Sequence, residues 1–157
     1  MSSGKHQAGF TYLGMLFLIG ALSAGLAATA EVWSHSRQRE KEAELLWVGN
    51  QFRQAIGLYY QRTPGAVKRY PEKLEDMLHD RRYATTQRYL RHIYADPVTG
   101  KSNWGLVEAP EGGIMGVHSL SETRPIKTSG FSGVQRGFGS ARTYSGWKFV
   151  YEPAMAR

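Results

Sequence analysis

The chain has 157 residues, no cysteine and a formal net charge of +7. Without cysteine it forms no disulfide and no thiolate metal site, and its length leaves room for one folded domain beyond the amino-terminal segment 1–30. The basic excess favours anionic surroundings without identifying a partner.

An uncharged stretch near the amino end is the first element. No Asp, Glu, Lys or Arg occurs between His6 and Ala30. About 20 predominantly apolar residues in a helix suffice to cross a bilayer, so residues 10–30 are expected to form a transmembrane helix. The leader before them carries Lys5 and no acid, which predicts a cytoplasmic amino end and a periplasmic carboxy-terminal domain.

An ordinary secretory signal is the alternative for the same segment. Ala28-Thr29-Ala30 fits the small-residue cleavage pattern of such signals. The apolar core of a signal has about 7–15 residues, which is shorter than the stretch 10–30. Helical patterning also continues beyond the supposed cleavage point, and both facts disfavour this interpretation.

Apolar residues next recur at helical spacing, which predicts one buried stripe on an amphipathic helix over 31–62. The stripe consists of Leu45, Val48, Phe52, Ile56 and Tyr59. The residues expected on the opposite face include Glu42, Glu44, Gln51, Arg53 and Gln61. Thr63-Pro64-Gly65 ends the helix, because a residue before proline disfavours helical geometry.

The remainder, 63–157, predicts a small globular α+β domain. A short second helix is expected over 70–78, and strands near 104–107, 113–117 and 146–151 form an antiparallel sheet against the long helix. Asp96-Pro97-Val98-Thr99-Gly100 reads as a turn. Residues 118–145, rich in Ser, Thr and Gly, predict a mobile loop.

These features together resemble the type IV pilins and, more closely, the pseudopilins of type II secretion systems. The shared features are a short basic leader ending in Gly9, Phe10 as the first mature residue, a helix that continues outward and a small carboxy-terminal domain. The motifs from Tyr70-Pro71 through Asp96-Pro97 to Trp104 are similar to the secretion branch. The resemblance implies a pilin-like fold.

Processing and assembly follow from that resemblance. Prepilin peptidase would cleave after Gly9 and methylate the new amine of Phe10, making the chain a substrate and not an enzyme. Phe10, Leu13 and Gly14 would lie where helices of neighbouring subunits pack in a periplasmic fibre. Implied partners are other pseudopilins, the peptidase, an inner-membrane assembly platform and membrane lipid. Most relatives carry glutamate at the place of Gly14, so the resemblance implies a minor or atypical pseudopilin.

Catalytic, metal and cofactor sites are not predicted. The five histidines are scattered, and no nucleophile elbow or metal-binding spacing occurs. From residue 123 onward the only acid is Glu152, whereas calcium needs about six to eight oxygen ligands. The expectation is therefore a protein without bound calcium and without a cofactor.

A cluster of arginines offers an alternative function as a DNA-uptake or adhesion subunit, or as a minor type IV pilin. The basic residues are Arg81, Arg82, Arg88 and Arg91. With the tyrosines among them, they would contact phosphates and stack on bases. The favoured interpretation is that the aromatic residues fill the core while the arginines face solvent, which disfavours nucleic acid as a partner.

Overall fold

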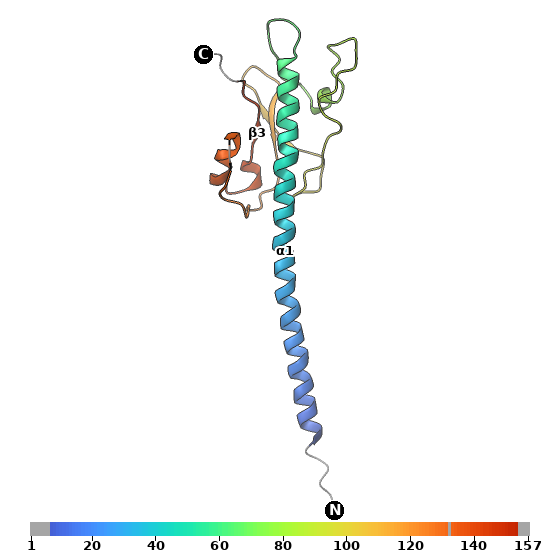
Figure 1. Ribbon diagram of the computed structural model, residues 1–157, viewed down its shortest axis with the longest axis vertical. Helices are drawn as coiled ribbons and strands as arrows, with labels where there is room; N and C mark the ends of the chain where they lie inside the picture. Colours follow the sequence, from blue (N-terminus) through green and yellow to red (C-terminus); the bar gives the residue numbers. More distant parts are fainter. Residues whose placement is uncertain (1–6, 132, 154–157) are drawn as a thin grey trace, which may run out of the picture. The chain divides into compact units, whose positions relative to one another are not determined.

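The computed structural model of the protein describes residues 7–131 and 133–153 (Figure 1). The chain divides into two compact units, 1–38 and 39–157. Helix α1, Gln7–Gln61, contributes to both units, and its described side chains are those of 11–23 and 35–61. The elements that follow α1 in the second unit are the 3-10 helix η1 (Leu74–Met77), strands β1 (Gly105–Glu108) and β2 (Ile114–His118), the 3-10 helices η2 (Gly133–Ser140) and η3 (Tyr144–Gly146), and strand β3 (Phe149–Val150).

The transmembrane half predicted for the long helix is corrected. Over the part of the chain that the structure describes, no helix combines the length and apolarity that crossing a membrane requires. This finding overturns the predicted fold with its transmembrane first half and the single-pass inner-membrane topology. The observed fold is a small α+β one with a three-stranded antiparallel sheet.

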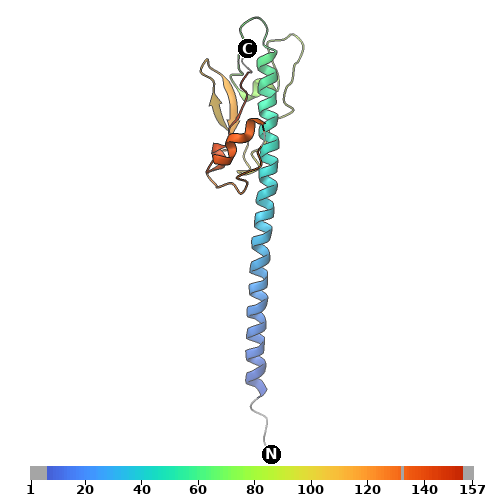
Figure 2. The same cartoon turned by 60° about the vertical axis from the view of Figure 1, so that its left-hand side comes forward.

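The apolar stripe of α1 forms one side of the core in the second unit. All five of its predicted members, Leu45, Val48, Phe52, Ile56 and Tyr59, are buried. Figures 1 and 2 both show the strands lying along this carboxy-terminal part of α1. The core residues that pack with the stripe include Met77, Trp104, Val117, Trp147 and Phe149. Burial of this apolar surface is the main favourable contribution to folding of the unit.

The sheet has the order β1-β2-β3, with both pairs antiparallel. Leu106 pairs with Val117, and Val117 in turn pairs with Phe149, so β2 is the central strand. The register shifts between Val107 and Glu108, where a bulge interrupts the ladder. The last strand has only two residues, which is shorter than the predicted range 146–151 because η3 occupies its beginning.

Two glycines let the end of the chain pack closely on α1. A Cβ at Gly49 would lie 2.4 Å from ring atoms of Phe149, and one at Gly57 would lie 2.6 Å from the ring of Tyr151. Contacts that short do not occur between real carbon atoms, so any side chain at these two positions would displace an aromatic ring. Glycine inside a helix costs stability, and here it permits the contact.

The predicted second helix over 70–78 is reduced to the single 3-10 turn η1. The carboxylate of Asp76 accepts hydrogen bonds from the amides of Glu72 and Lys73, at 3.1 and 2.9 Å, and so caps this turn. The helix does not continue beyond this turn, because the carbonyl of Met77 accepts hydrogen bonds from the amides of Tyr89 and Leu90. That carbonyl is therefore engaged by a distant segment.

The turn after Asp96 is built around its buried carboxylate. The carboxylate accepts hydrogen bonds from the amide of Val98 at 2.9 Å and the hydroxyl of Thr99 at 2.9 Å. The hydroxyl of Ser119 donates a third bond, at 2.6 Å, and ties the turn to the residue that follows β2. A buried carboxylate with several donors satisfies the requirement that buried polar groups be hydrogen-bonded.

The segment 118–145, predicted to be a mobile loop, contains short 3-10 helices and buried aromatic side chains. It contains η2 and the beginning of η3, and it buries Phe138 and Tyr144. Glu42, predicted on the polar face of α1, is instead 3% exposed and holds this segment. Its carboxylate accepts hydrogen bonds from the amide of Ile126 at 2.5 Å, the amide of Lys127 at 3.2 Å and the hydroxyl of Tyr144 at 2.9 Å.

Candidate functional site

The predicted processing and assembly residues lie in the first unit. Gly9 and Phe10 belong to α1, and their side chains lie outside the described residues. Leu13 is 66% exposed, and nothing lies within 4 Å of the Cβ position of Gly14. The structure thus leaves Leu13 and Gly14 accessible and does not test the cleavage prediction.

An uncovered apolar segment surrounds Leu13 and Gly14. We call residues 11–23 of α1 the assembly segment. Its exposed large apolar side chains are Tyr12, Leu13, Met15, Leu16, Phe17, Leu18, Ile19 and Leu22. They are distributed around most of the circumference of the helix, and Phe17 is 81% exposed. A contiguous exposed apolar surface marks a site of interaction with another apolar surface.

The polar group at the end of the assembly segment does not interrupt this surface. The hydroxyl of Ser23 donates to the carbonyl of Ile19 at 2.8 Å, within the same helix. Satisfied in this way, the hydroxyl needs no solvent partner. The assembly segment can therefore be covered without leaving the Ser23 hydroxyl unpaired.

Arg82, one of the four predicted patch residues, forms hydrogen bonds with residues at the carboxy-terminal end of α1. Its guanidinium donates to the carboxylate of Asp80 at 2.7 and 2.8 Å, to the hydroxyl of Thr63 at 2.8 Å and to the carbonyl of Tyr59 at 3.0 Å. It also lies 3.5 Å from the centroid of the Tyr59 ring. A cation at a helix carboxy terminus is favoured by the helix dipole and by the unpaired carbonyls there.

Electrostatics agree with this structural role. Burial would raise the pKa of the Asp80 carboxyl, but hydrogen bonds from Arg82 and Tyr89 outweigh burial and lower it. Burial, followed by the hydrogen bond that its hydroxyl donates to Asp80, raises the pKa of Tyr89 to about 12. Asp80 is therefore charged and Tyr89 neutral at physiological pH, the states that this hydrogen bonding requires.

The other three arginines of the predicted patch are exposed. Arg88 donates to the carbonyl of Leu78 at 3.3 Å, and Arg81 and Arg91 face solvent. Among the neighbouring aromatic residues, Tyr89 and Tyr94 pack against the hydrophobic core. The structure thus removes Arg82 from the patch, and Tyr89 and Tyr94 serve the core as the favoured interpretation expected.

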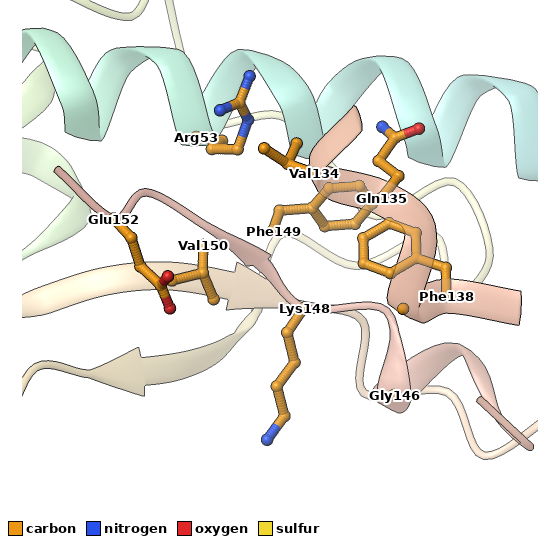
Figure 3. A pocket seen from close by; sticks show the side chains of 10 residues that line it. Arg53, Val134, Gln135, Phe138, Gly146, Lys148, Phe149, Val150 and Glu152 are labelled. Atoms are coloured by element: carbon orange, nitrogen blue, oxygen red, sulfur yellow. The ribbon is translucent and has the colours of Figure 1, made fainter. Parts of the chain in front are cut away.

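A pocket of about 490 Å³ in the second unit lies between α1, η2 and β3 (Figure 3). The rings of Phe138 and Phe149 form its apolar part. Arg53 lines one side, yet its Nε donates to Asn50, and the side chain of Lys148 points away from the aromatic rings in Figure 3. Its polar groups do not converge on one point, so this pocket has no recognisable chemistry.

Metal-binding side chains are not gathered anywhere in the described part of the chain. No group of three or more His, Cys, Asp or Glu residues is close enough there to hold an ion. The absence of calcium and of a cofactor remains a prediction from the sequence.

Comparison of the chain with family models, curated proteins and solved structures finds no match.

The buried acids are the residues that sequence reasoning missed. Glu42 lies three residues before Leu45, and that helical spacing places it next to the buried stripe, so a signal was present. Asp80 and Arg82 are two residues apart in an irregular segment, where no periodicity predicts which side chain is buried. Their pairing depends on contacts with Tyr59 and Thr63, which the fold supplies.

Proposed function

We propose that this chain is a subunit of a pseudopilin-type fibre that takes part in type II protein secretion. The observation that carries the proposal is the assembly segment, with eight large apolar side chains exposed around most of one helix. Packing against the same segment of neighbouring copies would cover them. The leader ending in Gly9 supports the same function through its resemblance to the pseudopilins.

The energetics favour such packing. Burying one large apolar side chain contributes roughly 1.5–3 kcal/mol, whereas forming a complex costs about 4–15 kcal/mol in lost freedom of motion. Burial of most of the assembly segment would therefore offset the cost of association. A helix that is apolar all round also accepts neighbours on more than one side, as a fibre requires.

Gly14 fits a minor or atypical subunit within this proposal. A glutamate there, as in most pseudopilins, would pair with the amine of a neighbouring mature chain and help to set the register. Glycine has no side chain to make this pair, and the space around it is open. Association at this position would then depend on apolar packing alone.

Cysteine crosslinking tests the proposal, because the chain has no cysteine of its own. In the full chain, Phe17→Cys should form disulfide-linked dimers much faster than Ser102→Cys, an exposed position in the second unit. Sedimentation of the unmodified chain should show species larger than a dimer. Equal crosslinking rates for the two variants, or a monomer in sedimentation, would contradict the proposal.

The DNA-uptake alternative is tested separately by DNA binding. It now rests on Arg81, Arg88 and Arg91, since Arg82 is held at the end of α1. If the secretion function is right, Arg88→Gln should leave any non-specific binding of the full chain to DNA at low salt unchanged. Salt-dependent binding that Arg88→Gln weakens would favour the alternative.

A further inference from the structure

A second basic region lies in the segment that the sequence presented as a loop. Between Thr123 and Tyr151 the chain carries no acid, and its basic residues are Arg124, Lys127, Arg136, Arg142 and Lys148. Basic residues without acids between them produce a positive potential that attracts anions.

The fold brings two of these arginines to one pocket of about 360 Å³. Arg124 and Arg142 line it together with Thr128, Ser140 and the backbone of Gly139. Both arginines are exposed, as a site open to a soluble ligand requires. No hydrogen bond or ion pair within the described residues reaches the guanidinium of Arg142.

The walls of this pocket are fixed by contacts behind it. The amide of Tyr144 donates to the carbonyl of Thr123 at 3.2 Å, which joins the two ends of the segment. A Cβ at Gly139 would lie 2.8 Å from the carbonyl oxygen of Thr128, so these two backbones approach closely. Glu42 holds the amides of Ile126 and Lys127. The pocket therefore exists before any ligand binds, which reduces the entropy cost of binding.

The lining fits a phosphate group. A guanidinium presents a planar fork of N–H donors that matches the oxygens of a phosphate. The Thr128 hydroxyl is a further donor at the rim, while the Ser140 hydroxyl donates to the carbonyl of Gly137 at 2.9 Å and presents only lone pairs. A single pocket of this size suits one phosphate group better than the extended track that a nucleic-acid backbone needs.

We propose that Arg124 and Arg142 form a binding site for a phosphate group, either of a soluble phosphomonoester or of a lipid headgroup. This site does not depend on the proposed fibre function, because it lies wholly in the second unit. The glycines of the same segment do not form a phosphate-binding loop between a strand and a helix. The charge comes from side chains instead.

Titration of the full chain with inorganic phosphate at low salt tests the site. Calorimetry should show saturable binding, and the amide resonances of Thr128 and Gly139 should shift as it proceeds. Arg142→Gln and Arg124→Gln should each raise the Kd about tenfold or more, since a charge-assisted contact is lost. Arg142→Lys keeps the charge but loses the planar fork, so it should also weaken binding.

Arg136→Gln is the matched control, because Arg136 is an exposed arginine of the same segment that does not line the pocket. It should leave the Kd within about twofold, the size of a general charge effect. No saturable phosphate binding, or an equal loss with Arg136→Gln, would overturn the proposal. If an arginine variant fails to fold, Thr128→Val tests the same pocket from its rim.

Vesicles distinguish the two sources of the phosphate. Binding to phosphatidylglycerol vesicles that Arg142→Gln weakens and Arg136→Gln does not, and that inorganic phosphate displaces, would support a lipid headgroup. Phosphate binding lost in Arg142→Gln, with unchanged vesicle binding, would support a soluble ligand. DNA binding that exceeds phosphate binding and responds equally to Arg136→Gln would overturn the pocket in favour of a general basic surface.

Discussion

At the scale of single residues, the buried carboxylate of Asp80 links three parts of the second unit. It binds Arg82, which in turn caps α1 through Tyr59 and Thr63, and it accepts the hydroxyl hydrogen of Tyr89 at 3.0 Å. A charged group so placed is stabilising only while all its partners are present. The end of α1 therefore depends on a residue far along the chain.

Asp80→Asn should lower the free energy of unfolding by about 2–3 kcal/mol, which urea denaturation would measure. The loss should be below the roughly 3–5 kcal/mol of a fully buried pair, because the Arg82 side chain stays 23% exposed. Glu108→Gln, at an exposed position of β1, is the control and should change stability little. Equal stability of the two variants would contradict the linking role of Asp80.

The same carboxylate predicts how stability depends on pH. Its pKa in the folded protein is lowered from the ordinary 3.8, so its contribution is complete above that value and is lost as the pH falls through the folded pKa. Stability should therefore fall as the pH drops below about 4. Urea denaturation midpoints measured at several pH values should fall less steeply toward acid pH in Asp80→Asn than in the unmodified protein.

At the scale of elements, periodicity predicted α1 well where one face is buried. The stripe from Leu45 to Tyr59 is buried because its spacing matches the helical repeat. Periodicity failed for η1 and for 118–145, where the elements are too short to show a repeat. There, hydrogen bonds that backbone amides donate to the carboxylates of Asp76 and Glu42 determine the structure, and no sequence pattern reveals which amides these are.

The contact between α1 and β3 yields a prediction at Gly49. Replacing a helical glycine by alanine normally stabilises a helix by about 1 kcal/mol. Gly49→Ala should instead destabilise the second unit by about 1–3 kcal/mol, because its Cβ would overlap the Phe149 ring. Gly20→Ala, with nothing within 4 Å, is the matched control and should not destabilise. Thermal denaturation of both variants distinguishes the cases, and a stabilised Gly49→Ala would contradict the packing.

The hydrogen bonds that the segment 118–145 donates to Glu42 lead to a second prediction at this scale. Glu42→Ala should leave the amides of Ile126 and Lys127 without their acceptor, at a cost of about 1.5–3 kcal/mol. Hydrogen exchange of these two amides should become much faster, while exchange in the sheet changes little. Glu44→Ala, at an exposed position of the same helix, should leave exchange unaltered. Unchanged exchange in Glu42→Ala would show that other contacts fix the segment.

At the scale of the whole molecule, the candidate sites differ in how far the sequence predicted them. The assembly segment was visible in the sequence because an uncharged stretch needs no tertiary information to be recognised. Its predicted role as part of a transmembrane helix was wrong. The arginine pocket was not visible, since Arg124 and Arg142 are far apart in sequence and meet only through the contacts of Tyr144 and Glu42.

The two functions proposed for the molecule are independent. The fibre function rests on residues 11–23, and the phosphate site rests on Arg124 and Arg142. Replacing Phe17 should therefore leave phosphate binding unchanged, and replacing Arg142 should leave crosslinking at Phe17→Cys unchanged. Each proposal can fail without the other.

The mass of the mature amino terminus tests the central claim most directly. When the full chain is produced together with a prepilin peptidase, mass spectrometry should find a chain that begins at Phe10 and carries one methyl group on its amine. That result would support processing as a pseudopilin. A mature chain that begins at Glu31 would contradict the account, because cleavage there removes the assembly segment.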